Sequence, residues 1–397
     1  MKDGRALQLV LFDLPVAPLY GGTAEVDLKI RALLDLGIEL HVHAWVSPKL
    51  HRQLRQGLVK LPDWQSRVAA LHCYPRPAAF TAWFSLRPHA VATRQGTRLN
   101  KVLAQGPKDI LLEGWQCSAC LDSSHLRQHR LWVRAHNRES TYYALQAQTT
   151  KQLLKKWYYN IESFRWRIDE KRASVAASRF RSPLQGVFSL CPLETERYRS
   201  EGHRTLYLPA FVRLDRPQPD EKQSLEPNIV YHGRLDIPDN QNAVFKFLAW
   251  AKENPRFNWV LAGSRASNQV RHAIRETPGL RWVDTPDDST LRTLVLTAAV
   301  HVLPSSGRAG LRLKMIHALT GLGHVLVDRS AVEGLPWESW VTPVAHDQDW
   351  LQAIRVALEN PPTPEAIAQR HQALFRHFDP ALNAEKLVAW TLGNQGS

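Results

Sequence analysis

Two segments in the second half of the chain carry residues suited to binding a diphosphate. In the first, an apolar run ends at Leu303 and leads into a loop with Gly307 and Gly310, where a helix is expected to begin. Glycine lets the backbone approach a ligand, and the unpaired N–H groups of a first helical turn attract phosphate. Arg312 and Lys314 add positive charge at the same end, as a bidentate ligand and as a point charge. The segment predicts phosphate binding, and a glycine turn before a solvated basic helix is the alternative.

The second segment is again a strand followed by a tight turn and a helix. Gly233 permits close approach of the backbone, and Arg234 could reach a diphosphate that is held by the first loop. Asp239 or Asn240 could cap the helix that follows, which needs no ligand. Because the two turns follow different strands of one predicted sheet, both can face one anion. That convergence favours a shared diphosphate site over either turn alone.

Further polar residues follow the predicted strands of the first half. Gly21 and Gly22 come after the first strand and open a helix, so they could accommodate phosphates or an acceptor. Glu113 ends one strand and His136 follows the next. A carboxylate and a histidine at adjacent strand ends predict polar catalytic groups in a cleft. Capping of the two loops is the alternative interpretation.

The elements that must position these residues form an alternating series of short apolar runs and amphipathic stretches. That alternation is typical of a parallel sheet wrapped by helices. In the first half the expected strands are Leu7–Leu14, Ile38–Trp45, Val68–Cys73, Asp109–Glu113, Leu131–Ala135, Val187–Leu190 and Leu206–Leu208. In the second half they are Ile229–His232, Asn258–Ala262, Leu280–Val283, Val300–Pro304 and His324–Val327.

The series predicts an α/β protein with two Rossmann-like, doubly wound domains that face each other across a cleft. We expect an N-terminal, acceptor-side domain over 1–208 and a proline-containing linker over 209–227. A nucleotide-sugar-binding domain is expected over 228–375, with a helix over 376–397 that packs back on the first domain. In such sheets ligands bind outside the carboxyl ends of the strands, where the candidate residues lie.

The formal net charge of +14 favours anionic partners, among them nucleotides, lipid phosphates and nucleic acid. The chain carries no motif of a known RNA- or DNA-binding module, so nucleic acid is not expected as a partner. No apolar run is long enough for a transmembrane helix, and the first residues do not fit a secretory leader. These features predict a cytoplasmic protein.

Two further features could bind a metal or a membrane. Cys117 and Cys120 form an isolated C-x-x-C, which we interpret as buried thiols, so no metal site is predicted. The stretch Lys151–Arg172 is predicted to be helical, basic and aromatic. It could lie on anionic lipid headgroups at the inner face of a membrane. The alternative is a long helix that packs its aromatic residues on the domain.

Several of these segments together resemble bacterial glycosyltransferases of the GT-B fold, close to family 4 (group 1) of those enzymes. The segments that carry the resemblance are PLYGGT at 18–23, ILLEGWQC at 110–117, VRAHNRESTYY at 133–143, VYHGRLDIPDNQN at 230–242 and the stretch 303–335. The resemblance implies a retaining, metal-independent hexosyltransferase in surface-polysaccharide assembly. Its donor would be a UDP- or GDP-linked sugar, its acceptor a glycan or a lipid-linked glycan, and it would need no other cofactor.

The resemblance also implies roles for individual residues. Arg234, Lys314 and Arg312 would bind the diphosphate, and His136 would lie close to the transferred sugar. Glu333 would accept hydrogen bonds from the ribose hydroxyls. Many family 4 members carry two glutamates eight positions apart, where this chain has Ala309 and His317. This departure bears on the contacts to the donor sugar, and it keeps open an alternative, a catalytically weak or inactive nucleotide-binding protein on the same fold.

Overall fold

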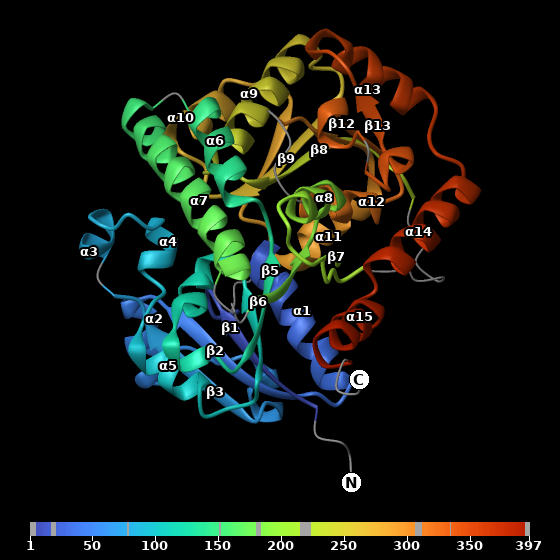
Figure 1. The fold of residues 1–397 in the computed structure, drawn as a ribbon. Helices are drawn as coiled ribbons and strands as arrows, with labels where there is room; N and C mark the ends of the chain where they lie inside the picture. Colours follow the sequence, from blue (N-terminus) through green and yellow to red (C-terminus); the bar gives the residue numbers. More distant parts are fainter. Residues whose placement is uncertain are drawn as a thin grey trace.

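The computed structural model describes residues 5–16, 21–77, 79–150, 152–179, 184–214, 224–305, 312–333 and 335–393. Within these ranges the strands form two separate parallel sheets, each packed against helices (Figure 1). This arrangement confirms the predicted α/β class with two doubly wound halves.

Among the described residues, the first sheet has seven strands in the order β3-β2-β1-β4-β5-β6-β7. They are β1 (Ala6–Leu11), β2 (Glu39–Val46), β3 (Ala70–Pro75), β4 (Asp109–Glu113), β5 (Arg130–Ala135), β6 (Leu184–Ser189) and β7 (Thr205–Tyr207). The helices of this half are α1 (Gly21–Asp35), α2 (Pro48–Arg55), α3 (Ala79–Trp83), α4 (His89–Ala92), α5 (Thr97–Leu103), α6 (Glu139–Thr149), α7 (Leu153–Arg179) and α8 (Pro192–Ser200).

The second sheet has six strands within the described ranges, in the order β10-β9-β8-β11-β12-β13. They are β8 (Glu226–Arg234), β9 (Asn258–Ser264), β10 (Leu280–Asp284), β11 (Ala298–Leu303), β12 (His324–Asp328) and β13 (Thr342–Val344). The helices are α9 (Pro238–Glu253), α10 (Asn268–Arg275), α11 (Asp288–Thr297), α12 (Leu313–Leu319), α13 (Trp350–Glu359), α14 (Pro364–Phe378) and α15 (Pro380–Leu392).

Both faces of the first sheet are buried, which explains why its strands are nearly continuous apolar runs. Successive side chains of a strand point to opposite faces. Leu9 and Leu11 accordingly pack in a core with α1 and α15, whereas Val10 packs in a second core with Leu112 on the other face. Packing on both faces fixes the position of each strand. The polar residues at the ends of β4 and β5 are therefore held together at the carboxyl edge of the sheet.

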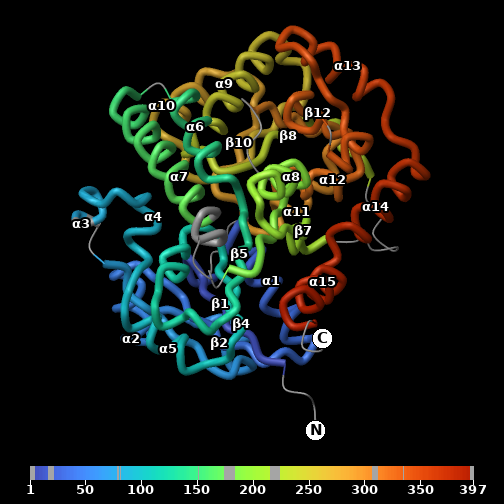
Figure 2. Tube along the Cα trace, viewed as in Figure 1, coloured from blue at the N-terminus to red at the C-terminus, as the bar shows by residue number. Residues whose placement is uncertain are grey.

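Within the described ranges, the chain crosses between the halves at two places. After β7, Phe211 packs in the core of the first half, while Ala210 and Val212 pack in the core of the second. At the end of the chain, Asp379 caps α15 by accepting a hydrogen bond from the N–H of Leu382 at 2.9 Å. Helix α15 lies beside α1, so the red end of the trace in Figure 2 returns to the blue beginning. The predicted domain boundaries stay predictions.

Candidate active site between the two sheets

A buried cluster of charged side chains lies where β4, β5 and α1 meet. Glu25 and Lys29 come from α1, Glu113 ends β4, and Arg134 lies near the end of β5. Lys29 forms an ion pair with Glu113, and Arg134 forms one with Glu25. The Nε of Arg134 lies 3.6 Å from Oε1 of Glu113, and all four side chains are at most 1% exposed. The cluster therefore holds two carboxylates and two cations out of water.

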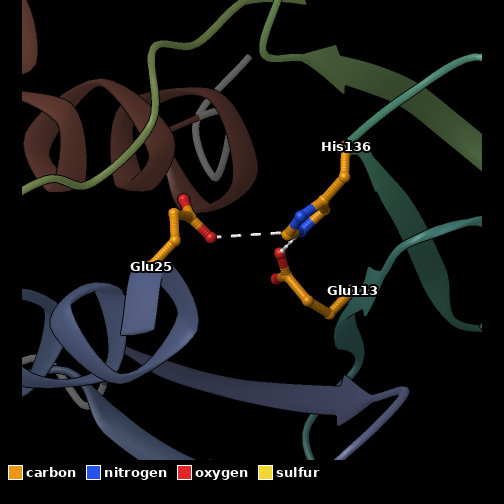
Figure 3. Close-up of side chains that lie close together, drawn as sticks. All are labelled: Glu25, Glu113 and His136. Atoms are coloured by element: carbon orange, nitrogen blue, oxygen red, sulfur yellow. Dashed lines mark hydrogen bonds and ion pairs between the residues drawn. The ribbon is translucent and has the colours of Figure 1, made fainter. Parts of the chain in front are cut away.

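His136 closes this cluster on its more open side, and Figure 3 shows Glu113 and Glu25 directed at its ring. Its Nε2 lies 2.5 Å from Oε1 of Glu113 and 3.9 Å from Oε2 of Glu25. Burial lowers the pKa of His136, and the neighbouring Arg134 acts in the same direction. The imidazole is therefore neutral at neutral pH, and its Nε2–H donates to Glu113. This tautomer leaves Nδ1 as a hydrogen-bond acceptor.

The structure thus brings together the predicted pair Glu113 and His136, but only one of the two side chains reaches solvent. The His136 side chain is 15% exposed, whereas Glu113 is 1% exposed and lies behind it. Glu113 cannot touch a substrate in this geometry. It fixes the ring and the tautomer of His136, as a positioning residue.

One ligand atom each from Glu25, Glu113 and His136 lie within 4.8 Å of one another, which is close enough for a metal ion. The charges argue against that use. Lys29 and Arg134 already balance the two carboxylates, so a divalent ion would add two uncompensated charges to a buried site. The arrangement fits an ion-pair network better than a metal centre.

Sequence reasoning missed Glu25, Lys29 and Arg134. A signal was present, because Glu25 and Lys29 stand four positions apart among the apolar residues of one helix face. Charged residues on the core-facing side of an amphipathic helix need partners, and here the partners are at the ends of β4 and β5.

A second cluster lies at the end of β8 and the start of α12. The Nζ of Lys314 donates to Oδ1 of Asn240 at 3.0 Å and to the Tyr231 hydroxyl at 3.2 Å. The same ammonium lies 4.8 Å from the centre of the Tyr231 ring. Burial lowers the pKa of Lys314 to about 7, and the nearby Arg312 adds to this, while Asp239 opposes it. Lys314 is therefore a desolvated amine held in one direction.

The other predicted cations lie around this lysine. Arg312 donates from Nη1 to Oδ2 of Asp239 at 3.0 Å, and Arg234 donates from Nη2 to Asp236 at 2.7 Å. Asn240 joins the two turns, because its Nδ2 donates to the Arg234 carbonyl at 2.8 Å. The structure therefore brings Arg234, Arg312 and Lys314 to one end of the second sheet, as the sequence predicts.

Gly233 stands between these cations with a φ of +151°, a conformation that other residues rarely adopt. A Cβ there would meet only Lys314 Cδ and Asn240 Nδ2, both at 3.8 Å, so the backbone rather than crowding requires glycine. By contrast, a Cβ on Gly22 would lie 3.9 Å from Phe12 in ordinary contact. Gly21 and Gly22 form the first residues of α1.

A cavity of about 380 Å³ is lined by residues of both halves. Glu25 of the first cluster lines it, and so do Leu313 and His317 of α12, the helix that carries Lys314. Its volume is within the range of small-molecule sites, at the low end of ~300–1,000 Å³. The remaining lining residues come from α1, β8, α11 and the segments that follow β7 and α12: Ala24, Leu28, Phe211, Val212, Arg213, His232, Asp288, Ser289, Leu291, Arg292, Val295, Leu296 and Thr320.

His232 is a buried polar group on the wall of this cavity, with 3% of its surface exposed. Neither ring nitrogen makes a well-formed hydrogen bond to a described residue, although the Lys314 backbone lies near the ring. Burial lowers the pKa of His232, and His301 and His317 reinforce this, so the ring is neutral. A neutral imidazole that lacks a partner is suited to a polar, uncharged group of a ligand.

The other predicted residues are placed as follows. Gly307 and Gly310, like Ala309, lie outside the described residues. Glu333 follows β12, is exposed, and is not among the residues that line the cavity. Cys117 and Cys120 are free and buried, which confirms their interpretation as buried thiols.

No family model matches the chain, and no curated protein matches it either. Solved structures match over nearly its whole length. HepE of Anabaena in complex with UDP-glucose has a TM-score of 0.61 at 13% identity and covers 96% of this chain and 98% of its own. A variant of S. aureus TarM in complex with UDP has a TM-score of 0.65 at 8% identity and covers 98% and 100%. The trehalose-6-phosphate phosphatase N-terminal domain of Candida albicans has a TM-score of 0.63 at 10% identity and covers 98% and 97%.

The chain has the GT-B fold. This confirms the predicted architecture of two Rossmann-like halves. Identities of 8–13% to these structures establish the fold alone. The roles of the candidate residues therefore depend on the geometry of the site. Among the described helices, none combines the length and the apolar character that crossing a bilayer requires.

Proposed function

We propose that this protein is a glycosyltransferase that moves a sugar from a nucleotide-sugar donor to a glycan or lipid-linked acceptor. The observation that carries the proposal is Lys314, a desolvated lysine that Tyr231 and Asn240 aim from the carboxyl end of the second sheet. Arg312 and Arg234 lie beside it. Three cations at one edge of a doubly wound sheet are suited to a diphosphate.

The compared structures support the nature of the donor. The HepE structures hold UDP, UDP and glucose, or UDP-glucose, and a TarM variant holds UDP. We extend this to the present chain as a UDP- or GDP-linked donor whose nucleoside occupies the cavity beside Leu313 and His317. His232 would then accept or donate a hydrogen bond to an uncharged group of that nucleoside.

The proposed chemistry is electrostatic. As the bond between sugar and diphosphate breaks, negative charge grows on the leaving phosphate, and Lys314, Arg312 and Arg234 stabilise it. These cations supply positive charge without a metal. His136, neutral and oriented by Glu113, offers Nδ1 to a hydroxyl of the transferred sugar. Retention of anomeric configuration and placement in family 4 are further parts of the proposal, supported by the sequence resemblance.

We place this reaction in surface-polysaccharide assembly, at the inner face of a bacterial membrane. The net charge of +14 supports contact with anionic lipid there. A nucleotide-binding protein without turnover is the second candidate, because His317 lines the cavity at a position where the resembled enzymes carry a glutamate.

Nucleotide binding is the first test of the proposal. Calorimetry and thermal shift with UDP-, GDP-, ADP- and CMP-sugars should find one base that binds and raises the melting temperature. A ligand at a hundred times its Kd stabilises the folded state by about 2.7 kcal/mol. Absence of binding by every nucleotide sugar at millimolar concentration would refute the proposal.

Replacing His136 separates the two candidate functions. His136→Ala is expected to lower transfer or donor hydrolysis by about a hundredfold, because a directed hydrogen bond to the sugar is lost. Binding of the free nucleoside diphosphate should stay within about twofold, because no nucleotide contact is removed. Glu113→Gln should show a smaller loss, since the amide can still accept from Nε2. Equal activity of the wild type and His136→Ala would favour the non-catalytic protein.

A further inference from the structure

An exposed apolar surface lies on the first half, away from the cavity. Phe80, Trp83, Phe84 and Leu86, on α3 and just after it, are between 49 and 88% exposed. Phe80 and Phe84 pack edge to face with ring centres 5.3 Å apart. Single exposed apolar residues are ordinary, but an aromatic group of this kind marks an interaction site.

The outer face of α7 continues this surface. Leu153, Trp157, Phe164 and Ile168 follow one another at intervals of four, seven and four residues, which places them on one side of the helix. They are between 40 and 82% exposed. Trp166, on the opposite side of the same helix, is fully buried. Helix α7 therefore packs aromatic residues on the domain from one side only, and the aromatic residues of its other side are exposed.

The two elements are in contact. The ring of Trp83 lies 5.6 Å from that of Tyr158 on α7, and Nη2 of Arg165 donates to the Trp83 carbonyl at 2.8 Å. In Figure 1, α4 lies beside α7, and α3 lies next to α4. The exposed side chains of α3 and α7 thus belong to one surface, called here the α3–α7 surface.

The charges of α7 are sorted between its two sides. Over the residues whose side chains are described, each acidic residue of α7 is at most 4% exposed: Glu162, Asp169 and Glu170. Glu162 accepts from the His89 N–H, and Glu170 accepts from the Ser140 hydroxyl, so these acids belong to the interior. The exposed charged residues of the same stretch are all basic: Lys155, Lys156, Arg167, Lys171 and Arg172.

We propose that the α3–α7 surface binds an anionic lipid bilayer, with the apolar stripe at the level of the headgroups and acyl chains and the basic residues on the lipid phosphates. An apolar stripe between lysines and arginines is the pattern of helices that lie in a membrane interface. Tryptophan and phenylalanine favour that boundary, and each basic residue adds attraction to an anionic leaflet. A neutral or basic protein partner would leave this sorted positive charge uncompensated, and an anionic bilayer satisfies both the charge and the apolar stripe.

A row of aromatic rings connects this surface to the candidate site. Tyr142 lies within electrostatic reach of Arg234 and Asp239. From Tyr142 the ring centres follow at 5.5 Å to Tyr143, then at 6.1 Å to Tyr159, 5.5 Å to Tyr158 and 5.6 Å to Trp83. Tyrosines suit amphipathic groups such as sugars and lipid headgroups. On the basis of the proposed function, we infer that an acceptor held in the bilayer reaches the donor along α6 and α7.

Vesicle sedimentation tests the surface directly. Wild-type protein should sediment with vesicles of phosphatidylcholine mixed with phosphatidylglycerol, and far less with phosphatidylcholine alone. The variant Phe84→Ser/Leu86→Ser/Trp157→Ser should lose roughly tenfold or more in partitioning. So should Lys155→Glu/Lys156→Glu/Arg167→Glu, whose remaining binding should depend little on salt, whereas the remaining binding of the serine variant should fall steeply with salt. The altered side chains are exposed, so the melting temperature should not change.

The matched control is Val356→Ser/Leu382→Ser, which removes two exposed apolar residues from α13 and α15 and should bind vesicles as the wild type does. Failure of the wild type to bind anionic vesicles, or equal binding by all variants, would overturn the proposal. So would sedimentation velocity showing a wild-type dimer that dissociates in the triple serine variant, since the surface would then join two copies of the chain. UDP-sugar binding measured without vesicles reports on the proposed function separately, and it should be the same in all variants.

Discussion

The Lys314→Met variant is expected to lose about a hundredfold to a thousandfold in kcat/KM for the nucleotide-sugar donor, the cost typical of removing one preorganised charge from a leaving group. Methionine keeps most of the length and volume of lysine, so packing on the Tyr231 ring should survive. What disappears is a desolvated ammonium that Tyr231 and Asn240 already direct. Steady-state kinetics of transfer, or of donor hydrolysis, measure this loss.

Two variants serve as controls for Lys314. Lys252→Met removes an exposed lysine at the end of α9 and should leave kcat/KM unchanged within about twofold. Lys314→Arg keeps the charge but not the compact head, and it should retain binding of the nucleotide better than Lys314→Met. If Lys314→Met and Lys252→Met behaved alike, Lys314 would not be a ligand of the diphosphate.

The same lysine predicts a pH dependence of donor binding. Burial lowers the pKa of Lys314 to about 7 in the free protein, and a bound diphosphate would raise it. Binding therefore takes up a proton above pH 7. Affinity is greatest below pH 7, falls as the pH rises from 7 to the raised value of the complex, and levels off above that value. Both phosphates of a nucleotide sugar are diesters and do not titrate in this window. Calorimetry in buffers of different ionisation enthalpy should detect the proton uptake in the wild type and not in Lys314→Arg.

The parts of this fold that the sequence predicts well are the buried parallel strands. Asp109–Glu113 is predicted and observed with the same bounds, because a short apolar run between turn residues has few other solutions. The meeting of Glu113 and His136 follows from it, since β4 and β5 pair in parallel with Glu113 opposite Arg134. His136 is then two residues beyond that level. The strand-end argument thus predicts which polar groups share an edge.

The features that the sequence does not predict depend on how each helix is rotated about its axis and packed on the sheet. Whether Glu25 and Lys29 face solvent or the ends of β4 and β5 depends on how α1 lies on the sheet, which no local pattern fixes. The three-residue strand β13 (Thr342–Val344) is too short for any periodicity, and it forms because β12 offers a free edge. The aromatic residues of α3 suggest a buried helix. Only the structure reveals that the side chains of Phe80 and Trp83 are exposed.

The buried ion pairs beside His136 carry the largest expected effect on stability. Arg134→Met should lower the free energy of unfolding by about 3–5 kcal/mol, because removing one partner leaves Glu25 buried without its closest cation. The substitution also removes a contact to residues 209–211, where the chain passes from the first half to the second after β7. Nη2 of Arg134 lies 3.3 Å from the Pro209 carbonyl, and Glu25 accepts from the Phe211 N–H at 3.2 Å. Urea denaturation measures the change.

The dependence on pH distinguishes this ion pair from simple loss of packing. Burial raises the pKa of Glu25, but Arg134 and Lys29 more than offset this, so the value lies below the ordinary 4.5. A lowered carboxyl pKa stabilises the fold above pH 4.5 and loses this contribution as the pH falls through the folded value. The difference between wild type and Arg134→Met should therefore be full at pH 7 and shrink below pH 4.5.

Two variants provide the comparison for Arg134→Met. Arg134→Met/Glu25→Gln removes both charges and should recover part of the stability, because no buried carboxylate is left without its partner. Arg130→Met, on the same strand, removes a half-buried arginine that pairs with Asp109 at 2.6 Å and should cost about 1 kcal/mol. Equal losses for Arg130→Met and Arg134→Met, with no change in either below pH 4.5, would show that hydrophobic packing rather than paired charge holds the two halves together at Phe211.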